Sequence, residues 1–353
     1  MRVLAAVVAL AIVPAASAAA PPKRANLPQL ARSLVKAGAP GAIVYVRTPT
    51  AARSGTAGYA DVAAHATMRA RDRWRIASVS KAFVSTVVLQ LEAEGRLDVD
   101  DPLERYLPGL VPNGNAISLR ELLNHTSGLF NYTDDGAFIQ SVLGNPGRMW
   151  TPRELVSVAF AHAPNFAPGS NWSYSNTGYV LLGLVVEAVT GKPLAQSLQE
   201  RLFTPLSLTS TSFPVGIALD DTFVHGYVSL DGPLVDVTPA LDPSWAWAAG
   251  GIVSSARDVT TFYRALLSGR LLPAAQLGEL EVPSAIAGTY GLGIFTTSTT
   301  CGRAFGHDGD FPGYRTEVLA NRKREAVVMV NVDETYVRWE RLEAAVKIAL
   351  CRG

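Results

Sequence analysis

The most informative residues of this chain read Trp74-Arg75-Ile76-Ala77-Ser78-Val79-Ser80-Lys81-Ala82-Phe83. Because Ser78 and Lys81 are three residues apart, a helix that includes both places the hydroxyl beside the ammonium. The side chains that follow are apolar nearly all round, as in a buried central helix: Ala82, Phe83, Val84, Val87, Val88 and Leu91. A lysine buried there loses the solvation that favours its charge, and it can then serve as the base that activates the serine. The stretch therefore predicts a serine nucleophile with a lysine partner.

The Ser-x-x-Lys spacing is not specific on its own. A second copy, Ser33-Leu34-Val35-Lys36, lies in a segment with one apolar stripe, and Gly38 can end the helix there. We interpret this copy as part of a surface helix without a catalytic role. For Ser78 alone, a serine that merely begins a helix near a lysine is an equal interpretation, so residues further along the chain have to decide.

The first residues have the pattern of a secretory signal. Met1-Arg2 is followed by an apolar run over 3–13, which is too short to span a bilayer, and then by small residues up to Ala18. We predict cleavage after Ala18, with cleavage after Ala20 as the alternative, so that residues 1–18 form the signal peptide. The mature protein is then expected to be secreted or periplasmic and to keep no membrane span.

Composition and charge exclude some functions and leave others open. The chain is 48% hydrophobic and 17% charged, which is enough apolar sequence for a large core. Lys and Arg number 31 against 30 Asp and Glu, so nothing indicates nucleic acid or an anionic surface as a partner. The only two cysteines are Cys301 and Cys351. Export favours a disulfide between them, worth at most roughly 4 kcal/mol, and two free thiols are the alternative.

Strand patterns lie at the two ends of the chain and helical patterns lie between them. Strands are expected in a hairpin over 41–60 and again at 290–296, 303–306, 314–319 and 326–332. Helices are expected at 119–123, 153–161, 179–189 and 256–267, with a final amphipathic helix over 339–350. We therefore predict an α/β (α+β) fold in which both ends of the chain build one antiparallel sheet. The single domain over 19–353 would consist of a sheet part, about 25–77 and 285–353, and an inserted helical part, about 78–284.

Two further motifs carry groups that could act with Ser78. Tyr174-Ser175-Asn176 is expected on a loop, where the phenol can relay a proton and the amide can fix a lysine and a substrate carbonyl. His307-Asp308-Gly309 follows an expected short strand, and its glycine would let substrate lie close to the backbone. Taken singly, each is better explained as a polar turn.

Together, Ser-x-x-Lys, Tyr-x-Asn and His-x-Gly follow the order of the three motifs of penicillin-binding enzymes. The chain resembles the serine β-lactamase-like, penicillin-binding hydrolases of the class C β-lactamase and secreted actinomycete D-Ala-D-Ala carboxypeptidase type. The resemblance also covers four other segments: Glu94-Gly-Arg-Leu-Asp-Val-Asp-Asp-Pro102, Ile117-Ser-Leu-Arg-Glu-Leu-Leu-Asn-His-Thr-Ser-Gly-Leu129, Ala249-Gly-Gly-Ile-Val-Ser-Ser255 and Tyr290-Gly-Leu-Gly293. It thus extends over nearly the whole mature length and implies the β-lactamase/transpeptidase-like fold.

The resemblance implies a role for each motif residue. Ser78 would be the acylated nucleophile, Lys81 its base partner and Tyr174 the proton shuttle to the leaving group. Asn176 would orient Lys81 and the substrate amide. The third motif, with His307, Asp308 and Gly309, would bind substrate, and His307 would replace the family's lysine as a weaker, titratable cation. The oxyanion hole would consist of the backbone N–H groups of Ser78 and Asp310.

Other chemistries find no support in the sequence. We find no Gly-x-Ser-x-Gly, His-Glu-x-x-His, Cys-x-x-Cys or phosphate loop, and we expect no cofactor and no metal. His125 is expected to be a structural loop residue in the wall of the cleft. Asp258 is expected to be a charge at a helix N-terminus.

The expected substrate is a small peptide, an ester or a β-lactam. A D-Ala-D-Ala carboxypeptidase is the first hypothesis, but the strand after Tyr290-Gly-Leu-Gly293 lacks the cation that usually holds a terminal carboxylate. Asp308 and Asp310 would also repel an anion. An esterase or β-lactamase-like hydrolase of the same fold is therefore the alternative, and a non-catalytic binder of cell-wall peptide or penicillin is a third, less favoured hypothesis. The sequence sets no oligomeric state.

Overall fold

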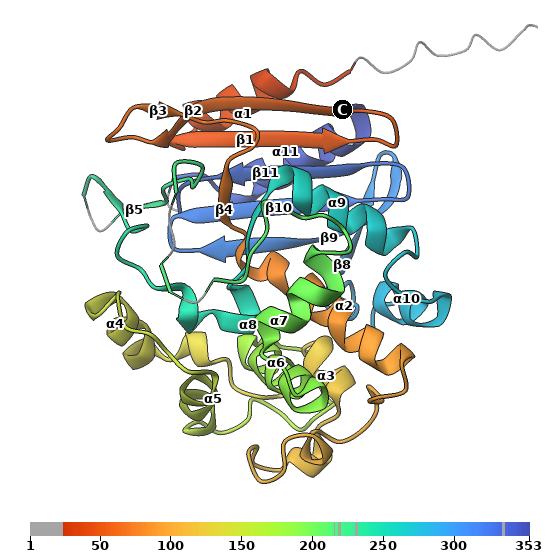
Figure 1. Cartoon of the computed structure of the whole chain (residues 1–353). Coiled ribbons are helices and arrows are strands. Elements are labelled where there is room, and N and C mark those ends of the chain that lie inside the picture. Colours follow the sequence, from red (N-terminus) through yellow and green to blue (C-terminus); the bar gives the residue numbers. More distant parts are fainter. Residues whose placement is uncertain (1–23, 215, 218–219, 230–231, 334–335) are drawn as a thin grey trace, which may run out of the picture.

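The computed structural model describes residues 24–353 apart from 215, 218–219, 230–231 and 334–335, so the predicted signal peptide lies outside the described residues. Within them, seven strands form one antiparallel sheet in the order β3-β2-β1-β11-β10-β9-β8. Their bounds are β1 (Gly41–Arg47), β2 (Ala52–Asp61), β3 (Ala66–Thr67), β8 (Phe295–Thr299), β9 (Gly302–Phe311), β10 (Tyr314–Ala320) and β11 (Glu325–Val330). Figure 1 shows the red N-terminal strands beside the blue C-terminal ones.

The two ends of the chain meet where β1 pairs with β11, in a register that runs from Ala42 opposite Val330 to Arg47 opposite Glu325. Both strands are rich in valine and other β-formers, and β11 is buried along its whole length. The predicted sheet built from both chain ends is confirmed.

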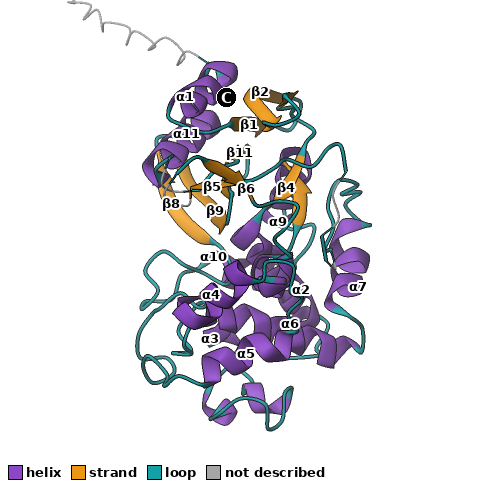
Figure 2. Cartoon of the chain, turned by 90° about the vertical axis from the view of Figure 1, so that its left-hand side faces the viewer, coloured by secondary structure: helices purple, strands orange, loops and turns teal. Residues whose placement is uncertain are grey.

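Helices cover both faces of this sheet. On one face, α1 (Leu27–Lys36) packs on β1 and β2, and α11 (Trp339–Arg352) packs on β10 and β11; on the other face lies α9 (Ala256–Leu267). Figure 2, turned by 90°, shows α1 and α11 together at one side of the strands. Ser33 is exposed on α1, and its hydroxyl donates to the Leu30 carbonyl. The predicted surface helix is confirmed.

A disulfide joins Cys301 to Cys351, as predicted. It ties the turn between β8 and β9 to the end of α11, with the two Cα atoms 5.4 Å apart. The final helix is thereby fastened to the hairpin that carries His307.

The helical part lies beside the sheet around α2 (Ser80–Ala93). The other helices there are α3 (Leu119–Leu123), α4 (Gly136–Gly144), α5 (Pro152–Phe160), α6 (Asn176–Thr190), α7 (Leu194–Leu198), α8 (Trp247–Gly250) and α10 (Ala274–Glu281). Short strands β4 (Arg73–Arg75) and β7 (Val253–Ser255) pair with each other, as do β5 (Tyr227–Ser229) and β6 (Leu234–Asp236). Single 3-10 or π turns are η1 (Ala77–Val79), η2 (Leu103–Arg105), η3 (Gly114–Ala116), η4 (Tyr132–Asp134), η5 (Gln199–Phe203) and η6 (Pro243–Trp245).

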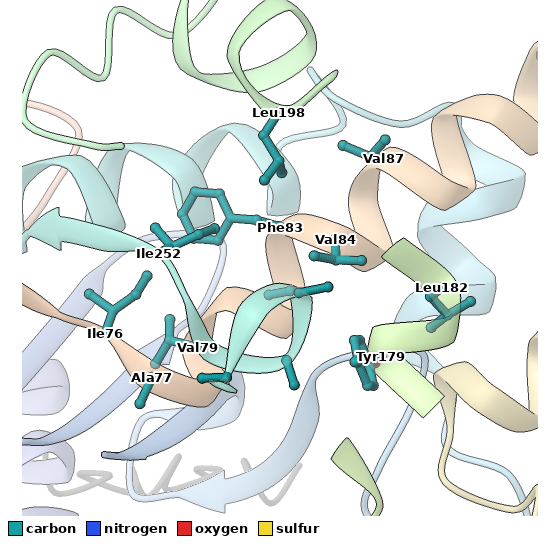
Figure 3. Close-up of a cluster of buried hydrophobic side chains, with 14 of the residues drawn as sticks. Ile76, Ala77, Val79, Phe83, Val84, Val87, Tyr179, Leu182, Leu198 and Ile252 are labelled. Carbon is teal, nitrogen blue, oxygen red and sulfur yellow. The ribbon is translucent and has the colours of Figure 1, made fainter. Parts of the chain in front are cut away.

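Helix α2 is buried nearly all round, as its sequence predicted. Figure 3 shows Phe83, Val84 and Val87 among apolar side chains from other elements, including Tyr179, Leu182, Leu198 and Ile252. Phe83 also stacks on Phe262 of α9, with ring centroids 3.7 Å apart. This packing fixes the helix that begins next to Ser78.

Among the described residues, no single helix is long and apolar enough to cross a membrane, while one bent pair, 176–190 with 194–203, reaches that length and composition.

Candidate active site

Ser78 sits in a tight turn between β4 and α2. The strand is held by its pairing with β7, and the Ile76 N–H donates to the Ile252 carbonyl at 3.0 Å. Ala77 then adopts a left-handed φ of 51°, an unfavourable conformation for a residue with a Cβ. Backbone strain of this kind is common at functional sites. Here the strained residue directly precedes Ser78, and both belong to η1.

Lys81 is fully buried at the start of α2, and three oxygens surround its amine. Nζ donates to Asn176 Oδ1 at 2.7 Å and to the Ala249 carbonyl at 2.7 Å, and it lies 3.0 Å from Ser78 Oγ. Burial lowers the Lys81 pKa well below its usual value, and Asp308 opposes the shift only in part. A neutral amine uses its two N–H groups on Asn176 and Ala249, so its lone pair faces the Ser78 hydroxyl. The arrangement suits a base.

Tyr174 stands on the other side of Ser78. Its hydroxyl donates to Ser78 Oγ at 2.8 Å, and its ring lies 4.8 Å from Lys81 Nζ. Burial raises the Tyr174 pKa well above its usual value, with Asp308 adding to the shift. The phenol therefore keeps its proton at neutral pH, which suits a proton donor.

The Tyr-x-Asn motif differs from its prediction in one respect. The sequence placed the whole motif on a loop, whereas Asn176 is the first residue of α6. The Asn176 N–H, which a helix start leaves free, donates to Asn131 Oδ1 at 3.0 Å, and its side-chain Nδ2 donates to Thr133 Oγ1 at 3.1 Å. Two residues from a distant segment thus fix both the helix start and the amide that receives Lys81.

The His-x-Gly motif also differs, because it lies inside β9 rather than after a short strand. Pairing with β10 continues to Phe311 opposite Tyr314, whereas the pairing with β8 ends at Gly306. From His307 onward, β9 therefore has one edge that no strand of the described part of the chain covers. A substrate backbone could lie along that edge.

His307 is buried and neutral at neutral pH. Burial lowers its pKa to about 4, although Asp308 opposes the shift. Its Nε2 lies 2.7 Å from the Tyr290 hydroxyl and its Nδ1 2.5 Å from the Asp308 carbonyl. At neutral pH, His307 therefore does not supply the cation that was expected in place of the family's lysine, because desolvation outweighs the neighbouring Asp308 carboxylate. His307 stays a candidate substrate-binding residue only as a neutral hydrogen-bonding group.

Gly309 brings β9 into contact with the turn that carries Ser78. A Cβ at this position would lie 2.3 Å from the Ile76 carbonyl oxygen, closer than any real contact, and 3.2 Å from the Ala77 side chain. Only glycine fits there. The close approach places Asp310 beside Ser78, so that both line the same two cavities. Their backbone N–H groups remain the predicted oxyanion hole.

Two cavities meet at Ser78. One, of about 640 Å³, is mostly apolar and lies under α4 and the β5–β6 hairpin. Its larger apolar walls are Ile139, Leu143, Val235, Trp245 and Phe311. The other, of about 650 Å³, is lined by Trp172, Tyr174, Tyr290 and the rim carboxylate of Asp308. Among the described residues, no lysine, arginine or histidine lines either cavity.

Asp258 lies where the sequence placed it, and His125 lies in a loop as predicted but lines neither of the two cavities. His125 is buried behind Tyr174, with ring centroids 4.3 Å apart. Asp258 lies in the first turn of α9 and accepts hydrogen bonds from Ser210 N and Thr211 Oγ1.

Sequence reasoning missed five residues of the site. They are Asn131, Thr133, Trp245, Ala249 and Tyr290, the last of which contacts His307. Ala249 and Tyr290 lie in segments that carried the family resemblance, which was the only available signal.

Comparison with known proteins agrees with this geometry. The family model named Beta-lactamase matches residues 27–350. The D-stereospecific amidohydrolase of a Streptomyces species superposes with a TM-score of 0.84 at 38% identity, covering 92% of this chain and 98% of that one. The D-amino acid amidase of Ochrobactrum anthropi SV3, solved with L-phenylalanine amide, gives 0.81 at 27% identity, with coverage of 92% and 96%.

A curated relative from Bacillus subtilis (strain 168), PbpX, carries a penicillin-binding protein's name. It is 27% identical over 303 residues, which are 86% of this chain and 72% of that protein. The chain spans between 53% and 64% of the length of the next curated relatives. With the family model matching nearly the whole described chain and the motif residues gathered around Ser78, the chain belongs to the Beta-lactamase family of serine hydrolases.

Proposed function

We propose that this protein is a serine amidohydrolase that forms an acyl-enzyme on Ser78 and acts outside the cytoplasm. The observation that carries the proposal is the hydrogen-bond chain in which Ser78 Oγ lies between the Lys81 amine and the Tyr174 phenol. A base on one side and a donor on the other are the two groups that acyl transfer to a serine needs.

The proposed reaction follows from these positions. Lys81 accepts the proton of the Ser78 hydroxyl while Oγ bonds to the substrate carbonyl carbon, and the resulting oxyanion is held by the N–H groups of Ser78 and Asp310. Tyr174 donates its proton to the leaving nitrogen as the C–N bond breaks, and the phenol is reprotonated from Lys81. Water then adds to the acyl-enzyme by the same route in reverse, which releases the acid.

The charge of the site favours substrates with an ammonium group. The only charged side chains among the described lining residues are carboxylates: Asp236, Asp308, Asp310 and Asp333. Asp236 is paired with His225 at 2.6 Å, whereas the Asp308 carboxylate is half exposed at the rim, and the neutral His307 beside it does not balance its charge. We therefore propose amides or short peptides of amino acids with a free amine, whose side chain enters the apolar cavity. The names of the amidohydrolase and amidase neighbours are consistent with this class.

A D-Ala-D-Ala carboxypeptidase is the second candidate, favoured by the penicillin-binding relative from Bacillus subtilis. An esterase or a β-lactamase-like hydrolase uses the same acylation chemistry and differs only in its leaving group. Export of the mature protein, with the signal peptide ending at Ala18, is supported by the disulfide and by the N-terminal sequence.

Substrate charge should affect the rate of hydrolysis at this site. The amide of a hydrophobic amino acid should be hydrolysed with a kcat/KM about 5- to 50-fold higher when its amine is free than when it is acetylated, because the rim carboxylates attract the ammonium. A D-Ala-D-Ala peptide and a penicillin, which both carry a carboxylate, are included in the same assay as anionic substrates. Asp308→Asn should reduce the preference for the free amine. Because this preference is a ratio of kcat/KM values for two substrates, any effect of the substitution on the Lys81 pKa cancels.

The control is Asp98→Asn, an exposed carboxylate that lines neither cavity. It should leave the ratio unchanged. Faster turnover of the D-Ala-D-Ala peptide than of the free amine would contradict the amidase proposal and favour the carboxypeptidase.

A further inference from the structure

His125 occupies an unfavourable position for a residue that only fills space. It lies in the loop after α3, is 1% exposed and adopts a left-handed φ of 65°. Histidine pays a conformational cost there that glycine would not. This conformational cost needs a compensating interaction, and the neighbours of the imidazole ring provide candidates for it.

His125 binds both chain neighbours of Tyr174. The Ser173 N–H donates to the His125 carbonyl at 3.1 Å, and the Ser175 N–H donates to His125 Nδ1 at 3.2 Å. Between these two hydrogen bonds the imidazole packs on the Tyr174 ring, with centroids 4.3 Å apart and planes tilted by 40°. One residue therefore fixes the backbone on each side of the phenol and the ring itself.

The Ser175 contact also defines the protonation state of His125. Because Nδ1 accepts a hydrogen bond, the proton of the neutral ring is on Nε2. That nitrogen is enclosed and has no hydrogen-bond partner among the described residues. Burial is the main reason that the His125 pKa lies well below its usual value, and Lys81 and His307 would lower it further when protonated. A buried N–H without an acceptor is unfavourable, so the histidine is not explained by stability.

We infer that His125 is a positioning residue for proton transfer, which holds the Tyr174 loop so that the phenol stays on Ser78 Oγ. The inference rests on the proposed function. Its physical basis is that proton transfer requires a near-ideal donor position, and a displacement of about 1 Å can cost ~100-fold in rate. The Tyr174 hydroxyl is 2.8 Å from Ser78 Oγ, and among the described residues no hydrogen bond joins His125 to Ser78.

The leaving group provides a readout that a merely structural role would not affect. An amide nitrogen has to be protonated before it leaves, whereas a nitrophenolate leaves without a proton. Loss of Tyr174 positioning should therefore slow amide hydrolysis far more than hydrolysis of the nitrophenyl ester of the same amino acid.

The test compares two substitutions of His125. His125→Phe keeps the ring but loses the acceptor for the Ser175 N–H, whereas His125→Asn keeps an acceptor and tolerates the left-handed backbone. We expect His125→Phe to lower kcat for the amide by about 10- to 100-fold with little change in KM, and for the ester by less than about 5-fold. His125→Asn should stay within about 5-fold of wild type on both substrates.

Two controls make the outcome decisive. In a Tyr174→Phe background, His125→Phe should cause no further loss on the amide, because both substitutions remove the same proton transfer. Hydrogen exchange at the Ser175 amide should be faster in His125→Phe than in His125→Asn, while thermal melts report whether each variant folds. Equal losses on amide and ester, additive losses in the double variant, or unchanged Ser175 exchange would overturn the inference. A wild-type protein that hydrolyses neither substrate would instead overturn the proposed function.

Discussion

Lys81→Met is expected to lower kcat/KM by about 10³- to 10⁴-fold, because it removes the group that takes the Ser78 proton. Methionine has nearly the length of lysine and suits a fully buried position in α2, so the fold should survive. Asn176 Oδ1 and the Ala249 carbonyl lose their donor, and circular dichroism with thermal melts would report that cost. The kinetic measurement is steady-state turnover of an amino acid amide.

The chain supplies a matched control for this variant. Lys36→Met changes the lysine of the second Ser-x-x-Lys copy, which lies on the surface helix α1, and it should leave kcat/KM unchanged. The pH profile adds a second check. Activity needs the neutral amine, so wild-type kcat/KM should fall as pH drops through the lowered Lys81 pKa. The residual activity of Lys81→Met should lack that acidic limb; an unchanged profile would remove Lys81 from the mechanism.

Gly309→Ala is expected to lower kcat by about 10²- to 10³-fold, the range for loss of an oxyanion-hole donor. The added Cβ would overlap the Ile76 carbonyl oxygen, at 2.3 Å, so β9 and the turn that carries Ser78 have to separate. Asp310 N–H then moves away from the position where the oxyanion forms. We expect a larger effect on kcat than on KM, together with a lower melting temperature.

Gly278→Ala is the control for this variant. Gly278 lies in α10, where an added Cβ meets no atom within 4 Å, and alanine should be neutral or slightly stabilising. Full activity in Gly309→Ala would mean that the contact between β9 and the nucleophile turn does not build the oxyanion hole.

Local patterns in the sequence predicted much of this architecture. The helix over 119–123 and the helix over 256–267 have the bounds that the patterns gave, and the sheet from both chain ends is confirmed. The extent of β9 was not predictable from alternation, because its pairing with β10 continues through a polar, glycine-containing segment. Strand length there depends on a partner, which local sequence does not encode.

The site was predictable in its motifs but not in its environment. Ser78, Lys81, Tyr174 and Asn176 do come together, yet the Ala249 carbonyl that receives Lys81 is 168 positions away. The neutral state of His307 was equally out of reach. The Asp308 carboxylate favours the protonated form of His307 and burial favours the neutral form, and the complete enclosure seen in the structure decides between them.

The most direct test of the account is covalent labelling of the nucleophile. A fluorophosphonate, and in parallel a penicillin, would be added to the purified wild-type protein and to the variants Ser78→Ala and Ser33→Ala, followed by intact-mass analysis and peptide mapping. We predict one adduct per chain, on Ser78, in wild type and in Ser33→Ala, and none in Ser78→Ala. An adduct that persists in Ser78→Ala would contradict the assignment of Ser78 as the acylated residue.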